Sequence, residues 1–527
     1  KHAAVHDTTA QIIALGGSVM AGGACRDRML GYGKSCAYPS RFATFFESCR
    51  ASGKTPASNS SFYFENRAIP ATSTAGVLPQ LPSLLSIVGA AGRRHSPTLL
   101  IVDFSVNDVI STADEQGRLA IGDYDIFRAV DGTWPAAATV PGADAVASVP
   151  LGKVSPQEEA GFMDALRPPA PAADGRRPRS MFLNANSSSP ARFRLSEGVM
   201  GMTEVMLRYI LSELPETAIV LMDGSCCVSR SKGGDGKCGP QAMELYDLSR
   251  RSRAFLAAAY GLPYLSYAEL LKDECTNANY FAQFAHPDAR THSIMAHGLE
   301  LWWMQLVQNL GRASGSAARQ EGARERAGGR TALGPPLARE WQKFDIICRE
   351  ALATYDPRAI AESGNPNALG AGVRLVEGNW SLYADRAEKP GWISTGPTYS
   401  TIEFDLEFGK TPRVTIVYDQ SYEGFGDIHA TLFNRTEGTD HNTGNIRKAA
   451  TYTKTPTNVP GQVLPGLRAD TMRVTQTSTI TFNVGDVFNG WQNTGFSVSP
   501  FARDLSLRLK LASTPPAKVK VRYISSC

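Results

Sequence analysis

The sequence predicts an α/β domain, in which helices flank a parallel sheet, followed by a second domain that is an antiparallel β-sandwich. Three observations support this fold class. Short apolar runs alternate with helical patterns up to residue 310, an Ala/Gly/Arg-rich stretch follows, and strictly alternating polar and apolar segments fill the chain from residue 371. Strands that alternate with helices are typical of a parallel sheet covered on both faces. Many period-two segments separated by Gly, Asn and Pro are typical of a sandwich.

The strands and helices of the first domain are predicted from hydrophobic periodicity. Apolar runs predict strands at residues 11–15, 62–66, 98–104 and 218–223. The third run is the most continuous, so we expect it at the centre of the sheet. Helical spacing of apolar residues predicts helices at residues 38–50, 197–213, 242–260 and 297–310.

Changes in composition suggest the domain bounds. Residues 1–310 are the expected α/β domain, with an irregular insertion around 111–194 that is rich in Ala, Pro, Gly and Ser. An insertion of this kind is usually an excursion or a lid. Residues 311–345 are the expected linker, and residues 346–527 the helix-led C-terminal β-sandwich domain. The alternating segments of that domain are 401–408, 413–418, 471–475, 478–484, 505–511 and 518–523.

The overall composition excludes several classes of function. The chain has 527 residues, of which 43% are hydrophobic and 20% charged, with a net charge of +4. These values are ordinary for a globular protein and give no indication of nucleic-acid binding. No apolar run approaches the roughly 20 residues that span a bilayer. Neither a C-x-x-C pair nor a cofactor motif occurs, so we expect no metal and no organic cofactor.

Cysteines and glycosylation motifs indicate an oxidising compartment. Several of the nine cysteines lie in Gly-rich polar segments, which suits disulfides, and the odd number leaves at least one outside intrachain pairs. Asn-x-Ser/Thr sequons, the acceptors of N-linked glycans, begin at Asn59, Asn186, Asn379 and Asn434. We therefore expect the protein outside the cell or in the secretory pathway, at the cell wall or cell surface.

Ser18 is the first candidate for catalysis. It follows an apolar strand and two glycines, where a helix is expected to begin. A nucleophile there would lie at the carboxyl edge of the sheet, where open α/β folds place their sites, and the helix amino end and the Ser18 N–H would stabilise an oxyanion. The structural alternative is that Ser18 only caps the helix. The G-x-S-x-G elbow of α/β-hydrolases is excluded, because Met20 stands two residues after Ser18.

Three later blocks carry polar residues at matching places. Residues 66–72 form a loop after the second strand, beginning with Asn66. Residues 103–108 end the most apolar strand and offer Asn107 as a neutral donor, or else a turn or cap pair with Asp108. His286 precedes Pro287, which keeps it out of a helix. Each block by itself is more simply explained as structural.

In this order the four blocks resemble those of the GDSL/SGNH hydrolases, a superfamily of serine esterases and acetylesterases. The matching segments are residues 16–19, 66–71, 105–108 and 286–287, the last with His292 six residues on. The resemblance implies a flavodoxin-like parallel sheet. It also implies Ser18 as the nucleophile, His286 as the base that takes its proton, and an oxyanion hole made by the N–H groups of Ser18 and Ala71 and the Asn107 side chain. The family usually has Gly where this chain has Ala71, whose backbone donor is retained.

The main departure from the family is Gln283, which occupies the position of the catalytic acid, three residues before His286. Loss of a comparable carboxylate costs about 10⁴ in rate in a serine protease. Three outcomes are open: Gln283 or a main-chain carbonyl orients the histidine in a Ser–His dyad, Asp288 replaces the acid, or the site is not catalytic. His292 and His297 are interpreted as structural members of the following loop and helix.

The C-terminal segments around Trp380, 389–393 and 417–423 resemble the sandwich, here expected to be jelly-roll-like, that accompanies this hydrolase type in some algal and fungal secreted proteins. Trp380 and Trp392 either stack on sugar rings or, more simply, belong to the core. The function expected is a secreted esterase acting on a small acyl or acetyl ester or on cell-wall polysaccharide. The alternatives are a non-catalytic structural or carbohydrate-binding glycoprotein on a degenerate fold, and an acyltransferase using the same serine.

Overall fold

The structure is a computed structural model of the chain. It describes residues 10–23, 25–51, 62–86, 98–112, 121–125, 192–215, 217–225, 240–271, 281–283, 286–314, 333, 336–338, 351–362, 369–385, 389–396, 399–409, 412–421, 423–434, 437–438, 449–450, 462–467, 475–484, 505–512 and 517–527. These residues group into two compact units, those within 1–70, 88–114 and 118–343, and those within 71–87, 115–117 and 344–527. The domain bounds expected from composition remain a prediction.

The first unit contains a five-stranded parallel sheet. Its strands lie in the order β4 (Phe62–Asn66), β1 (Ala10–Gly16), β5 (Thr98–Asp103), β8 (Ala218–Asp223) and β9 (Tyr264–Ser266). Numbered along the chain this is the order 2-1-3-4-5, which is the doubly wound, flavodoxin-like order. The predicted fold class is confirmed, and β5 is central and buried along its whole length as expected. The sequence did not reveal β9, because its three residues are only half-buried and too few to show a period.

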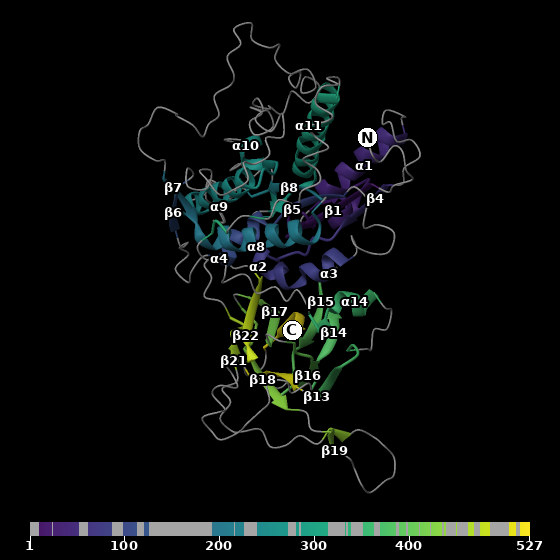
Figure 1. Cartoon of the computed structure of the whole chain (residues 1–527). Helices are drawn as coiled ribbons and strands as arrows, with labels where there is room; N and C mark the ends of the chain where they lie inside the picture. The colour runs from purple at the N-terminus through teal and green to yellow at the C-terminus, as the bar shows by residue number, and fades with distance from the viewer. Residues whose placement is uncertain are drawn as a thin grey trace. The chain divides into compact units, whose positions relative to one another are not determined.

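Helices cover this sheet (Figure 1). On one face, α1 (Tyr38–Ala51) packs beside α11 (Ala289–Ser314) over a core formed with side chains of β1, β5 and β8. Elsewhere α8 (Glu197–Glu213) packs beside α9 (Pro240–Ala259), which also contacts α4 (Ser105–Thr112). The predicted helix at 297–310 was too short at its start. The real helix α11 begins eight residues earlier because Asp288 caps it, its Oδ1 accepting the Thr291 N–H at 2.7 Å.

Short elements interrupt this α/β order. After β1 the chain makes a small hairpin of β2 (Arg26–Asp27) and β3 (Gly31–Tyr32) and a 3₁₀ turn, η2 (Gly33–Ser35). The helix α10 (Tyr267–Leu271) follows β9. Within the expected insertion, β6 (Ile121–Asp125) pairs with β7 (Arg192–Ser196), and residues 126–191 lie outside the described part of the chain.

The second unit is built on two antiparallel sheets that share one core, which confirms the expected sandwich. One sheet has the order β14 (Ser381–Ala384), β15 (Pro390–Ser394), β24 (Val519–Ser526), β17 (Arg413–Gln420) and β22 (Gln476–Asn483), with β12 (Ala353–Tyr355) pairing β24. The other has the order β13 (Val373–Glu377), β16 (Thr401–Leu406), β23 (Leu505–Leu511), β18 (Ile428–Asn434) and β21 (Gln462–Leu464). The rings of Trp392 and Phe404 meet edge to face between the sheets, 5.0 Å apart.

Both candidate tryptophans belong to this core. Trp392 is fully buried, Trp380 is 3% exposed, and both lie in one apolar cluster. The helix α14 (Pro357–Glu362) precedes the strands that were predicted, and β19 (Glu437–Gly438) pairs β20 (Ala449–Ala450). Residues 471–474 of one expected strand lie outside the described residues.

The edge strand β22 is covered by a segment from far earlier in the chain. This segment includes α2 (Thr74–Val77), η3 (Leu78–Gln80) and α3 (Leu81–Ser86) and groups with the second unit. The Thr477 N–H of β22 donates to the Ala71 carbonyl at 3.0 Å, and Thr479 Oγ1 donates to the Ala75 carbonyl at 3.3 Å. Covering an edge strand in this way removes a surface on which other chains would pair. In the described part of the chain, no helix combines the length and the apolar character needed to cross a membrane.

Candidate active site

Ser18 lies in a tight turn directly after β1. It is 7% exposed, and the turn is closed by the Gly23 N–H, which donates to the Ser18 carbonyl at 2.8 Å. The Gly17 N–H donates to the Asp103 carbonyl at 2.9 Å and ties the turn to β5. The expectation of a helix starting at Ser18 was wrong. Gly22 has a positive φ of 69°, and a Cβ there would lie 2.2 Å from the Gly33 carbonyl oxygen, so the chain leaves the helical path and packs against itself.

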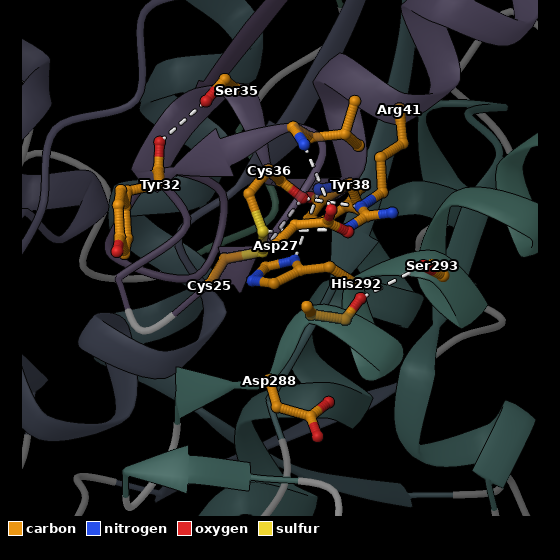
Figure 2. Close-up of a disulfide and its surroundings, with 12 residues drawn as sticks. Cys25, Asp27, Tyr32, Ser35, Cys36, Tyr38, Arg41, Asp288, His292 and Ser293 are labelled. Carbon is orange, nitrogen blue, oxygen red and sulfur yellow. Dashed lines mark hydrogen bonds and ion pairs between the residues drawn. A yellow bond between two sulfur atoms is a disulfide. The ribbon is translucent and has the colours of Figure 1, made fainter.

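A disulfide closes the excursion that follows this turn. Cys25 and Cys36 are bonded, and both are buried. Arg41 of α1 donates from Nε to the Cys36 carbonyl at 2.7 Å and pairs through Nη2 with Asp27 at 2.7 Å (Figure 2). The Arg41 hydrogen bond and those from the Met29 and Leu30 N–H groups lower the pKa of Asp27 to about 2. The excursion is therefore fastened at its base to α1. From the cysteine content we had expected disulfides, and this is one.

The second block holds the Ser18 turn through Asn66. Its Nδ2 donates to the Met20 carbonyl at 2.9 Å, and its Oδ1 accepts the Ala68 N–H at 3.1 Å. The Ile69 N–H then donates to the Gly16 carbonyl at 2.8 Å. In the sequence, Asn66 stood out only as the first residue of the second block. In the structure its two hydrogen bonds hold the Ser18 turn against the loop after β4.

Ala71 has an unusual backbone conformation. Its φ is 63°, and among the described residues it is the one non-glycine residue with a positive φ. This conformation suits Gly, which the family usually has at this position, and residues held in it are often found at functional sites. Ala71 groups with the second unit. Its place in the oxyanion hole therefore remains a prediction.

Asn107 lies on the first turn of α4 and is 8% exposed. Just before this helix, Asp103 Oδ1 accepts hydrogen bonds from Ser105 N at 3.1 Å and Ser105 Oγ at 2.6 Å. Asn107 and Asp108 lie within the first turn of α4, so they are not a turn or cap pair that precedes it. Asp108 instead accepts from Arg253 at 3.3 Å in the interior.

His286 lies against the Ser18 turn. A Cβ atom placed on Gly23 would lie 3.0 Å from the Ser18 carbonyl oxygen, 3.1 Å from His286 Cδ2 and 3.2 Å from His286 Nε2. The His286 ring and the Ser18 carbonyl oxygen therefore both border the space that a side chain at Gly23 would fill. The structure brings together two residues that are far apart in the sequence.

The acid position lies beside His286 in the backbone. Gln283 of β10 (Phe281–Gln283) is the Cα partner of His286 in β11 (His286–Pro287). The Gln283 side chain lies outside what the structure describes. Asp288 uses Oδ1 to cap α11, so that oxygen already has a partner.

His292 and His297 were interpreted as structural members of the loop and helix that follow His286. His292 lies in the helix, α11, and not in the loop. Its Nδ1 accepts the Tyr38 N–H at 3.3 Å, which places the ring proton on Nε2, and its ring stacks on that of Tyr38 (Figure 2). Burial, with Arg41 and His286 nearby, lowers the pKa of His292 to about 3. His297 is exposed and bonds Glu300 at 2.8 Å, which raises its pKa.

A buried group of charges behind the site was missed by sequence analysis. Asp103 and Asp223 end the neighbouring strands β5 and β8, and each accepts hydrogen bonds from the serine two residues later. Arg253 of α9 pairs with Asp223 at 2.9 Å and with Asp108 at 3.3 Å. Burial raises the pKa of Asp103 to about 6. The signal that identifies this group is the pattern Asp-x-Ser, which recurs at the ends of two apolar strands.

Among the described residues, no group of three or more His, Cys, Asp or Glu side chains is arranged to hold a metal ion. The polar groups that the structure brings near Ser18 are an imidazole and backbone amides. Such groups are suited to proton transfer and to stabilising a negatively charged oxygen.

A scan against models of protein families found no match, and a search of curated proteins found none either. Solved structures do resemble the chain. A two-domain esterase active on acetylated mannans is 12% identical, with 98% of this chain and 92% of that chain covered and a TM-score of 0.46. An extracellular lipase from Streptomyces rimosus is 14% identical, with coverages of 55% and 98% and a TM-score of 0.29. An acetyl xylan esterase from Geobacillus stearothermophilus is 11% identical, with coverages of 56% and 97% and a TM-score of 0.28.

Proposed function

We propose that this protein is a serine esterase that hydrolyses acyl or acetyl esters, with extracellular or cell-wall polysaccharide as the substrate class. The observation that supports the proposal is that the His286 ring and the Ser18 carbonyl oxygen both lie about 3 Å from the point where a Cβ atom of Gly23 would be, 3.1 Å and 3.0 Å from it. An imidazole close to a serine at the carboxyl end of a parallel strand is suited to act as the base for that serine.

In the proposed reaction Ser18 Oγ attacks the ester carbonyl while His286 takes the hydroxyl proton. The tetrahedral oxyanion is stabilised by the N–H groups of Ser18 and Ala71 and by the Asn107 side-chain amide. Collapse of this intermediate breaks the ester bond, and His286 returns the proton to the leaving alcohol. Water then attacks the acyl-serine with His286 as the base, which releases the acid and restores Ser18.

The deciding experiment compares hydrolysis of a short-chain aryl ester by the wild type and by Ser18→Ala. We expect activity to fall to the uncatalysed level in Ser18→Ala. It should be unchanged in Ser48→Ala, a matched change on the exposed face of α1. Circular dichroism checks that both variants are folded. Equal activity in wild type and Ser18→Ala would refute the proposed nucleophile.

Gln283 gives a second, independent test. In the proposal it orients His286 without supplying the negative charge that stabilises the imidazolium. Gln283→Glu has nearly the same shape and adds that charge, so we expect kcat to rise. An unchanged kcat would remove Gln283 from the catalytic group and favour an orienting main-chain carbonyl.

The non-catalytic alternative is a structural or carbohydrate-binding glycoprotein. The feature that favours it is Gln283 at the acid position, and this alternative predicts no ester hydrolysis by either protein in the first experiment.

We also propose that the protein is secreted, because the buried Cys25–Cys36 disulfide is typical of oxidising compartments. We propose the domain bounds 1–310, 311–345 and 346–527, because the composition changes at these points.

A further inference from the structure

We infer that the C-terminal sandwich carries a binding site of its own for a neutral sugar ring. The site is a cavity of about 580 Å³ at the edge strand β14. This volume falls within the range of about 300–1,000 Å³ that is usual for small-ligand sites. The inference extends the proposed function, because it concerns a site that takes no part in ester hydrolysis.

Aromatic surface is available to a ligand at this cavity. Tyr383 is 59% exposed although it belongs to a strand, and its partner across the sheet is Gly391, which has no side chain to cover the ring. Ile393 adds an apolar wall. An exposed aromatic ring on an edge strand offers the flat apolar surface against which the C–H face of a sugar packs.

Trp380 also lines the cavity and adds a polar group that lacks a partner. The residue is 3% exposed, and its indole Nε1 has no hydrogen-bond partner among the described residues. Its side chain also belongs to the apolar core of the sandwich, so Trp380 forms the inner boundary of the cavity.

The charges of the cavity favour a neutral ligand with many hydroxyl groups. Asp385 pairs with both Lys518 and Lys520. Burial opposes ionisation of Asp385, but the hydrogen bonds from the two lysines outweigh it and lower its pKa to about 2. The wall therefore presents an ammonium beside a carboxylate, and a sugar hydroxyl both donates and accepts. The charged residues that line the cavity are Asp385 and Lys518, whose formal charges cancel.

The sequon residue Asn379 lies at the same cavity. Its Oδ1 accepts from Ser394 Oγ at 3.0 Å, which fixes the side chain and leaves the amide nitrogen as a further donor. Because Asn379 is also a candidate for glycosylation, the test uses protein from a host that does not add N-linked glycans.

The test measures binding to polysaccharide by gel electrophoresis in the presence of galactomannan, xylan or mixed-linkage β-glucan. The Ser18→Ala protein is used so that no ester is consumed. We expect at least one polysaccharide to retard it. We expect Tyr383→Ala to weaken the binding about tenfold or more through loss of the ring contact.

Tyr399→Ala is the matched control, since Tyr399 is 49% exposed in the same unit and does not line the cavity. It should bind like the parent. Lack of retardation by all three polysaccharides overturns the inference, and so does retardation that survives Tyr383→Ala. Because hydrolysis of an aryl ester is measured separately on the wild type, failure of the sugar site and failure of the proposed esterase are distinguishable.

Discussion

At the scale of single residues, Gly23 is the position that most directly tests the candidate site. A Cβ atom at this position would lie 3.0 Å from the Ser18 carbonyl oxygen and 3.1 Å from the His286 ring, so the absence of a side chain leaves room for both. We predict that Gly23→Ala pushes the ring away from the serine and lowers kcat about 10- to 100-fold, because small displacements of catalytic groups have effects of this size. Aryl-ester kinetics measure this change.

The control is Gly298→Ala in α11. A Cβ there meets only Leu270 at 3.5 Å, an ordinary contact, so activity should be unchanged and the helix slightly more stable. If Gly23→Ala retains full activity while folding normally, the imidazole does not need its present position and the proposed pairing of Ser18 with His286 fails.

Ala71 has a backbone conformation that Gly adopts more readily than other residues, with φ at 63°. A glycine at this position would hold the same backbone with less strain, so Ala and Gly differ here in their side chain and not in the path of the chain.

At the scale of elements, α1 and α11 are joined through His292. Its Nδ1 accepts the Tyr38 N–H at the start of α1, and its folded pKa of about 3 lies below the unfolded value of about 6.5. The stabilisation from neutral His292 is thus fully present above pH 6.5. We predict that it is lost as the pH falls toward 3, by about 1.4 kcal/mol per pH unit, because only the unfolded chain takes up the proton in this window.

Urea unfolding of the wild type and His292→Asn between pH 7 and pH 4.5 measures this dependence. The Asn side chain retains an acceptor for the Tyr38 N–H but does not titrate, so the stability of this variant should fall less steeply with decreasing pH. His297→Asn is the contrasting variant. The folded pKa of His297 is raised by Glu300, so its contribution is lost as the pH rises. Parallel curves for the wild type and His292→Asn would contradict the assignment.

At the scale of the molecule, the first unit depends on one buried ionic group. Arg253 of α9 reaches Asp223 at the end of β8 and Asp108 in α4, and all three side chains are at most 4% exposed. We predict that Arg253→Met lowers the free energy of unfolding by about 3–5 kcal/mol, because it leaves two carboxylates buried without their cation. Chemical denaturation measures the loss.

Arg251→Met is the matched control for this change. Arg251 lies two residues away on the same helix, is 43% exposed and pairs with Asp247 at 2.8 Å. An exposed pair of this kind contributes about 0–1 kcal/mol, so the control should stay close to the wild type. Equal effects of the two substitutions would show that the buried group does not stabilise the unit.

The elements predicted best are those with long local periods. The strands at 62–66 and 218–223 and the helix at 197–213 have the predicted bounds, and the alternating segment at 505–511 is a strand of the sandwich. The predictions failed where a local rule was overridden. Gly22 ends the helix expected after Ser18, Asp288 starts α11 early, and β9 is too short to have a period.

The sequence by itself determined the order and type of the secondary-structure elements, the sandwich that follows the α/β unit, and the choice of Ser18, Asn107 and His286 as candidates. These depend on periodicity and short motifs, which neighbouring residues express locally. Only the tertiary structure decided that His286 lies against the Ser18 turn, that Arg253 pairs with two buried carboxylates, and that Trp380 belongs both to the core and to a cavity. These relations join residues far apart in the chain, and such contacts arise from packing, which local patterns do not encode.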